Sequence, residues 1–210
     1  MPHPANLPLF LLASLVLLLT PGPAVLYIIA RSLSHGRVAG LVSVLSIEVG
    51  NLMHVLAATL GLSVLLLSSA LAFAVVKYLG AAYLIYLGLR TLLTRAAGEP
   101  TAGLQQHSLR RIFAQGVLVA TLNPKTALFF VAFLPQFVDP ARGAVGMQLL
   151  VLGSLFVMLA IATDSLYALL AGTAGQWLQG KQFLRTQRYV TGAVYLGLGV
   201  TAALADARRP

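Results

Sequence analysis

The sequence contains no cysteine and very little charge. Without a single Cys among its 210 residues, it has no disulfide framework, no thiolate metal site and no cysteine nucleophile. Only 9% of the residues are charged, whereas an ordinary soluble domain has about 25%. Because 59% of the residues are hydrophobic and the mean hydropathy is +0.89, the chain has too few polar residues for a surface that faces water. We therefore expect its surface to face lipid.

Acidic residues are especially scarce. The chain has 14 Lys and Arg but only five Asp and Glu, a formal net charge of +9. In a soluble protein this excess would suggest a nucleic-acid partner. Here most of the basic residues fall in alternate connections between apolar segments, which is the pattern that orients a membrane protein. We therefore predict a protein that binds no nucleic acid.

Enzyme motifs are missing as well. The four His residues stand at positions 3, 35, 54 and 107 and complete no metal-binding pair, and there is no phosphate loop or nucleophile elbow. The sequence therefore predicts neither an enzyme nor a metal or cofactor site. Because no Lys or Arg precedes Arg31, the first apolar segment lacks the basic region of a signal peptide, and we expect it to remain as the first helix.

What the sequence does contain is a series of long apolar segments. They cover residues 7–30, 38–67, 71–89, 112–134, 146–172 and 189–204. A helix that spans the membrane needs about 20 apolar residues, so little chain is left for an extramembrane domain. The segments are too long and too continuous for outer-membrane strands. We predict an all-α polytopic membrane protein with six transmembrane helices.

The flanking basic residues predict the orientation of these helices. Connections one, three and five hold nine Lys and Arg, and the opposite side holds four. The nine are Arg31, Arg37, Arg90, Arg95, Arg110, Arg111, Lys181, Arg185 and Arg188; the four are Lys77, Arg142, Arg208 and Arg209. Because basic connections stay in the cytoplasm, both termini are predicted outside.

The two halves of the chain share three short patterns in the same order. Thr20-Pro21 resembles Asn123-Pro124, residues 51–54 resemble 164–167, and Lys77-Tyr78 resembles Arg188-Tyr189, at offsets of 103, 113 and 111. Residues 1–93 and 112–210 would then be two repeats joined by a cytoplasmic linker at 94–111. Since each repeat has an odd number of spans, the second is inverted. The alternative is chance recurrence of common apolar residues.

Proline residues interrupt the first helix of each repeat. Thr20, Pro21, Gly22 and Pro23 lie inside the first segment, and Asn123 and Pro124 lie inside the fourth. We expect Thr20 and Asn123 to cap new half-helices that begin at Pro21 and Pro124. The half-helix starts at 21–24 and 124–126 would face each other near the midplane, where their positive ends could bind a carboxylate. The alternative is a pair of simple proline kinks.

Three ionisable residues lie deep in the predicted spans: Glu48, Lys125 and Asp164. A charge at the centre of a membrane costs about 2.5 to 3.5 kcal/mol, so the three must face a wet cavity or one another. We expect Glu48 or Asp164 to accept the coupling proton and Lys125 to be a charge partner or a carboxylate ligand. The alternative is a static ion pair between Lys125 and one acid that fixes the helix register.

Further polar residues accompany the two acids. Asn51 and His54 follow Glu48 on the same third of a helix surface, and Tyr167 follows Asp164 by one turn. Asn51 is a predicted substrate ligand. His54 and Tyr167 are predicted auxiliary residues, with His54 as a proton relay or a polar ligand.

At these residues the chain resembles the LysE/RhtB family of bacterial amino-acid exporters. The resemblance rests on TPGP at 20–23, RSLSHG at 31–36, NLMH at 51–54, KYLGAAYLIYLG at 77–88, NPK at 123–125, FLPQF at 133–137 and Asp164, in this order. It implies a LysE-like fold in the bacterial inner membrane and proton-driven export of amino acids or close derivatives. Many family members have an acid where this chain has Asn51, and here the acid is Glu48, one turn earlier.

The sequence thus predicts an exporter that works by alternating access of two inverted three-helix units. The expected partners are an amino acid, protons and the lipid bilayer, and the chain could form a homo-oligomer. Two other functions remain open from the residues: an exporter of ions or metal cations, which would use the same acids on a bare cation, and a membrane scaffold subunit without cargo.

Overall fold

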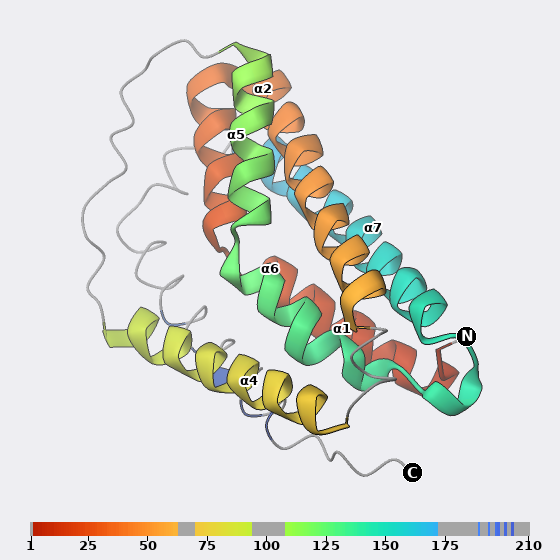
Figure 1. Ribbon diagram of the computed structural model, residues 1–210. Helices are drawn as coiled ribbons and strands as arrows, with labels where there is room; N and C mark the ends of the chain where they lie inside the picture. Colours follow the sequence, from red (N-terminus) through yellow and green to blue (C-terminus); the bar gives the residue numbers. More distant parts are fainter. Residues whose placement is uncertain are drawn as a thin grey trace.

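The computed structural model describes residues 2–62, 70–93 and 108–171, with a few isolated positions between 189 and 203. Throughout these residues the regular structure is helical and includes no strand, which confirms the predicted all-α class (Figure 1). The end of the second predicted segment, most of the linker at 94–111 and nearly all of the sixth segment lie outside the described residues.

The first apolar segment is broken into two helices. After the 3-10 turn η1 (Pro4–Asn6), α1 (Leu7–Leu19) ends at Thr20, and α2 begins only at Pro23. Gly22 is the residue before the helix, with φ −126° and ψ −170°. The predicted break is confirmed, but the prediction that Thr20 caps a helix starting at Pro21 is wrong.

The reason is the second proline. A proline disfavours the helical conformation of the residue before it, so Pro23 keeps Gly22 extended and a helix cannot pass from Pro21 through Gly22. Pro23 itself is a favourable first helical residue because its missing N–H would have had no partner there. Thr20 instead ends α1, and its hydroxyl donates to the carbonyl oxygen of Val16 at 2.7 Å.

α2 (Pro23–Ala57) reverses direction at Gly36. Gly36 has φ 81° and ψ 178°, a backbone conformation that is essentially restricted to glycine. Ser32 and Gly40 would lie about 12 Å apart along a straight helix, yet a Cβ atom on Gly40 would collide with the hydroxyl of Ser32. α2 therefore consists of two legs, residues 23–35 and 37–57, which lie side by side in Figure 1, and the π-helical turn η2 (Ala58–Leu62) extends the second leg.

The fourth apolar segment is also broken. Ser108 caps α5 (Leu109–Thr121) by accepting from the backbone N–H of Arg111 at 3.4 Å, so this helix starts three residues before the predicted segment. After Leu122 and Asn123 the chain continues as α6 (Pro124–Leu128), the π-helical turn η3 (Phe129–Phe133) and the 3-10 turn η4 (Leu134–Phe137). The two helical parts are bent by 40°.

The cap of α6 agrees with the sequence. Oδ1 of Asn123 accepts from the backbone N–H of Lys125 at 3.1 Å, and Pro124 is the first helical residue. The predicted restart of a helix at Pro124 is therefore confirmed. Only one proline follows Asn123, so α6 begins directly at that proline, whereas α2 begins only at the second proline of its break, Pro23.

Two further helices complete the described part. α4 (Ala70–Leu93) packs against α6 and η3, and α7 (Val145–Ala171) packs along α2 and α1. The 3-10 turn η5 (Pro140–Arg142) and Gly143, which has φ 115°, connect η4 to α7. Both long helices agree with the predicted segments at 71–89 and 146–172 to within a few residues.

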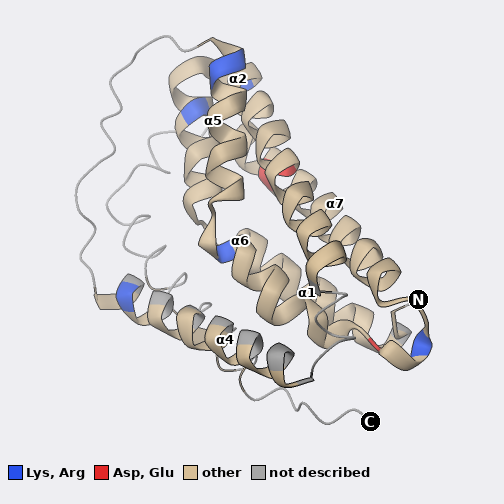
Figure 2. Cartoon of the chain, in the orientation of Figure 1, with Lys and Arg blue, Asp and Glu red and all other residues tan. Residues whose placement is uncertain are grey.

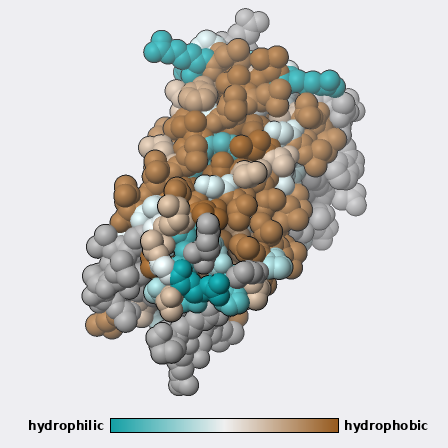
Figure 3. All heavy atoms as spheres, turned by 90° about the vertical axis from the view of Figure 1, so that its right-hand side faces the viewer, coloured by the Kyte–Doolittle hydropathy of each residue, from teal (hydrophilic) through white to brown (hydrophobic). Residues whose placement is uncertain are grey.

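The surface fits a membrane. By length and composition, Pro23–Gly61, which contains the reversal at Gly36, and Val145–Ala171 are apolar enough to span a bilayer, and the bent pair from Leu109 to Phe137 would be a third such element. Apolar side chains cover most of the described part of the face in Figure 3. Large apolar residues are exposed on the long helices, for example Met158 of α7 at 66%. In Figure 2 basic residues lie where α2 reverses and α5 begins, and few lie along the helices. The protein is thus a helical membrane protein.

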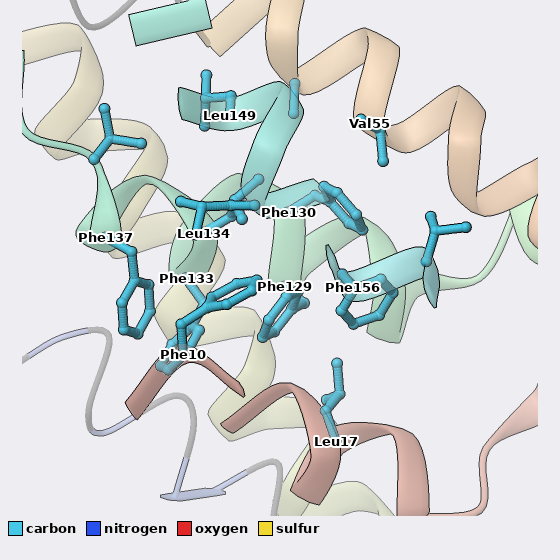
Figure 4. Packing of buried hydrophobic residues seen from close by; sticks show 14 of the residues in the cluster. Phe10, Leu17, Val55, Phe129, Phe130, Phe133, Leu134, Phe137, Leu149 and Phe156 are labelled. Carbon is cyan, nitrogen blue, oxygen red and sulfur yellow. The ribbon is translucent and has the colours of Figure 1, made fainter. Parts of the chain in front are cut away.

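An aromatic core fixes α1 against the second half of the chain. Phe10 packs edge-on to Phe137 at 5.3 Å between ring centroids, and Phe129 stacks on Phe156 at 5.0 Å (Figure 4). The rings come from α1, η3, η4 and α7. This phenylalanine cluster fills the interior between the two helix breaks and the Asp139 end of the molecule, and its members are Phe10, Phe129, Phe130, Phe133, Phe137 and Phe156.

Candidate functional site

A small cavity lies where the two broken helices meet. Its volume is about 20 Å³, enough for roughly one water molecule. The lining residues come from α1, both legs of α2, α6 and α7: Leu18, Ala24, Val25, Ile47, Asn51, Asn123, Lys125, Thr126, Phe156 and Asp164. The breaks therefore do come together in space, as the sequence predicts.

One wall of the cavity consists of two helix starts. The first intrahelical bonds run from the N–H of Leu26 to Gly22 and from the N–H of Ala127 to Asn123. The N–H groups of the preceding residues Ala24, Val25 and Thr126 consequently have no acceptor within their own helices. All three residues line the cavity. Two positive helix ends thus point at one small space, which favours an anionic group.

Lys125 adds a full positive charge to this wall. It is 5% exposed, and its ammonium donates to the carbonyl oxygen of Thr20 at 2.6 Å. Thr20 ends α1, so Lys125 also neutralises the negative end of that helix. Its charge interacts with the carboxylate of Asp164 as well. Lys125 thus ties the two breaks together, and its interaction with Asp164 leaves the predicted ion pair with one acid open.

The cavity lining also includes an acid and an amide. Asp164 of α7 and Asn51 of the second leg of α2 line the cavity, and Glu48 is hydrogen-bonded to Asn51. Nδ2 of Asn51 donates to Oε2 of Glu48 at 3.0 Å. The carboxyl groups of Glu48 and Asp164 are within hydrogen-bonding reach of each other. Both side chains are buried, at 4% and 3% exposure.

Each acid also has an oxygen atom that lacks a donor. Among the described residues, none donates a hydrogen bond to Oε1 of Glu48 or to Oδ1 of Asp164, although both atoms are buried. A buried carboxylate oxygen without a donor is costly. Since two carboxyl groups can bond to each other only through a proton, the pair is suited to hold a proton or to receive an ammonium group.

His54 and Tyr167 do not line the cavity but reach the helix breaks. Nε2 of His54 donates to the carbonyl oxygen of Ala120 at 3.1 Å, and the imidazole stacks on Phe130 at 6.0 Å. The hydroxyl of Tyr167 donates to the carbonyl oxygen of Leu19 at 2.9 Å. In the described conformation His54 therefore contacts the end of α5 and not the acids.

Packed side chains adjoin the cavity on two sides. On one side Phe156 joins the cavity wall to the phenylalanine cluster. On the other side Tyr27 packs in one hydrophobic cluster with Ala24 and Ile47 and donates to the carbonyl oxygen of Ile112 at 2.6 Å. Arg31 lies over the ring of Tyr27 and donates to Gln115 at 3.1 Å, so these contacts tie the first leg of α2 to α5.

Most of the residues predicted for the site do converge on the cavity. Asn51, Asn123, Lys125 and Asp164 line it, Glu48 adjoins it, and Thr20 takes part through its carbonyl group. Pro21, Gly22, Pro23 and Pro124 shape the breaks without lining it.

Sequence reasoning missed the apolar lining residues. Ile47 stands one turn before Asn51, and Phe156 stands about two turns before Asp164. Helical spacing places each on the same face as its polar neighbour, and this signal could have identified both.

Comparison with known proteins assigns the chain to a family. The profile of the LysE type translocators matches residues 15–206. The chain belongs to this family. It is 31% identical to a homoserine/homoserine lactone efflux protein of Salmonella typhimurium over 95% of each chain. It is also 31% identical to an uncharacterized membrane protein of Vibrio cholerae, over 94% of this chain and 96% of the other. No solved structure matches the chain.

Proposed function

We propose that this LysE type translocator exports amino acids or close derivatives across the bacterial inner membrane in exchange for protons. We propose neutral amino acids such as homoserine and threonine as its substrates. The observation that carries the proposal is the cavity, whose lining combines the helix starts at Ala24, Val25 and Thr126 and the ammonium of Lys125 with the carboxylate of Asp164. A zwitterionic amino acid is complementary to this combination of charges.

The two charged groups of the substrate have distinct partners. Its carboxylate would accept hydrogen bonds from the N–H groups of Ala24, Val25 and Thr126, close to Lys125. Its ammonium would lie against Asp164 and the side-chain oxygen of Asn51. The apolar residues Ile47 and Phe156 would surround the substrate side chain.

Proton coupling would use the contact between Glu48 and Asp164. With one shared proton the two acids carry a single negative charge, which the charge of Lys125 balances. An incoming ammonium would bind Asp164 most favourably once that proton has left. Binding the cargo and releasing a proton would then be linked, which is the requirement for antiport.

The cavity must open during transport, because about 20 Å³ cannot hold an amino acid. We propose that two inverted three-helix repeats, 1–93 and 112–210, open it to alternate sides. In support, α1 and α5 both have 13 residues, both end at a break, and both are followed by a helix with proline at its first position. Such broken helices at the midplane are typical of secondary transporters.

The basic end, with Arg31, Arg37, Arg110 and Arg111, is proposed to face the cytoplasm. The end that contains Asp139 and Arg142 would then face the periplasm, together with both termini.

The proposal can be tested by measuring the transport of homoserine and of homoserine lactone by the purified protein in liposomes. The Salmonella typhimurium relative is named for homoserine and homoserine lactone efflux, and these two differ in that the lactone has no carboxylate. We expect the wild type to move homoserine when a proton gradient is imposed. Lys125→Met should slow homoserine more than the lactone, because only homoserine presents a carboxylate to the helix starts.

Three results would contradict the proposal. If Lys125→Met slowed the transport of homoserine and of the lactone equally, the cavity would not contain a site for the substrate carboxylate. Failure of the wild type to move any amino acid, together with flux of a divalent cation, would favour a cation exporter, and absence of all flux would favour a scaffold. Competition by amino acids against divalent cations in the same liposomes separates these outcomes.

A further inference from the structure

Two hydrogen bonds cross between the halves of the chain in the same way. His54 follows Asn51 by three residues on the second leg of α2, and its Nε2 donates to Ala120 of α5 at 3.1 Å. Tyr167 follows Asp164 by three residues on α7, and its hydroxyl donates to Leu19 of α1 at 2.9 Å. The second leg of α2 is thus hydrogen-bonded to α5 of the other half, and α7 is hydrogen-bonded to α1.

The two acceptors occupy equivalent places. Leu19 is the last residue of α1, and Ala120 is next to the last residue of α5. Carbonyl groups in the last turn of a helix lack the usual donor four residues later, and such groups need other donors in a membrane interior. The carbonyl oxygen of Ala120 also accepts from the backbone N–H of Asn123 at 3.0 Å, so His54 is a second donor there. The side chains of His54 and Tyr167 therefore stabilise the C-terminal ends of the two broken helices beside the cavity.

Each donor also stands on the helix face of a cavity residue. Residues three apart in a helix are neighbours on its surface, so His54 lies beside Asn51 and Tyr167 lies beside Asp164. Any movement of α7 that displaces Asp164 therefore displaces Tyr167 and pulls on the end of α1. The same relation joins Asn51, through His54, to the end of α5.

We propose that His54 and Tyr167 are paired positioning residues that couple the cavity to the helix break of the opposite half. Both bonds hold the breaks together while the cavity is closed, and they release in turn as the cavity opens to one side or the other. This inference rests on the proposed transport function. It gives His54 a task that needs only an N–H donor, which neutral and protonated imidazole can both provide.

Three substitutions isolate the bonds from the packing. Tyr167→Phe and His54→Phe remove the donors but retain aromatic rings, so His54→Phe can still stack on Phe130. His54→Gln restores an N–H donor. Tyr83→Phe is the matched control, because Tyr83 is an exposed residue of α4 whose ring contacts Tyr86.

The first measurement is the rate of amino-acid transport across the membrane of liposomes that contain the protein. Loss of one hydrogen bond should lower the maximal rate about 3- to 10-fold in Tyr167→Phe and in His54→Phe. The half-saturating concentration should change less than about 2-fold, since neither residue lines the cavity. His54→Gln should exceed His54→Phe in maximal rate, and Tyr83→Phe should equal the wild type.

A second measurement does not depend on transport. Because the chain has no cysteine, Ala24→Cys places a single thiol on the cavity wall, where a small maleimide reports opening. Labelling should be faster in Tyr167→Phe and His54→Phe than in the parent or in Tyr83→Phe. Unchanged labelling in both variants would overturn the inference, even if the transport rate fell.

The two proposals fail in different ways. A wild type that moves no amino acid would refute the export function, whereas the labelling rates would still test the coupling of cavity and breaks. A wild type that exports amino acids, with both variants normal in rate and in labelling, would refute the coupling alone. Equal rates for His54→Gln and His54→Phe would also refute it, because the N–H donor would then be irrelevant.

Discussion

The side chain of Asn51 donates a hydrogen bond to Glu48, one turn earlier on the same helix, at 3.0 Å. Asn51 thereby takes one carboxylate oxygen of Glu48, and among the described residues the other oxygen has no donor. Glu48, Asn51 and Asp164 form one polar unit.

Neutralising either acid should abolish proton-driven export. Glu48→Gln and Asp164→Asn each remove a charge-assisted interaction, and we expect the rate under an imposed proton gradient to fall about 10- to 100-fold. Liposome transport with and without the gradient is the measurement. Asp139→Asn is the matched control, because Asp139 caps Ala141 through Oδ1 at 3.0 Å and an asparagine retains that oxygen. If both cavity variants, taken singly, keep full gradient-driven transport, the coupling assignment is wrong.

The two helix breaks should differ in their dependence on a polar cap. Asn123→Ala removes the cap of α6 and should destabilise the protein by about 0.5 to 2 kcal/mol, seen as a lower midpoint of thermal unfolding in detergent. Asn123→Ser should recover part of the loss. Thr20→Val should lower the midpoint less, because Thr20 ends α1 and caps no following helix. A larger effect of Thr20→Val would contradict the observed start of α2.

Replacing Gly36 tests the reversal of α2. Gly36→Ala forces a side chain into a conformation that costs about 1 to 3 kcal/mol, so the unfolding midpoint should drop. Gly61→Ala is the control, because a Cβ there meets nothing within 4 Å, and this variant should be neutral or slightly stabilised. Similar midpoints for Gly36→Ala and the wild type would mean that α2 does not turn at this residue.

The orientation in the membrane can be measured with single cysteines. Ser34→Cys lies next to the reversal of α2 at the basic end, and Ala141→Cys lies at the opposite end; both positions are exposed. A thiol reagent that cannot cross membranes should label only Ala141→Cys in intact cells, and both should react after permeabilisation. The reverse pattern would place the basic end outside.

Much of the fold could be predicted because membrane helices have a strong signal. Long apolar runs located α4 and α7 to within a few residues, and the basic residues Arg31 and Arg37 marked the connection in which α2 reverses. The exact start of α2 could not be found from the rule that threonine before proline caps a helix. Pro23 overrides that rule through its effect on Gly22.

The candidate site could be predicted in its composition but not in its bonding. Rarity alone identified Glu48, Lys125 and Asp164, because charges are expensive in a membrane interior. Their partners depend on how four helices meet. Lys125 bonds to the backbone of Thr20 and His54 to the backbone of Ala120, and backbone carbonyl groups have no signature in the sequence.

Phe156 belongs both to the cavity wall and to the phenylalanine cluster, where it contacts Phe129 and Phe130. The groups that would bind the charges of a substrate are fixed by helix ends and hydrogen bonds, whereas the wall beside its side chain is a set of packed rings. Enlarging that wall requires repacking of the aromatic rings and breaks no hydrogen bond. The size range of acceptable cargo would therefore evolve by substitutions in the phenylalanine cluster, while the recognition of an amino-acid head group stayed constant.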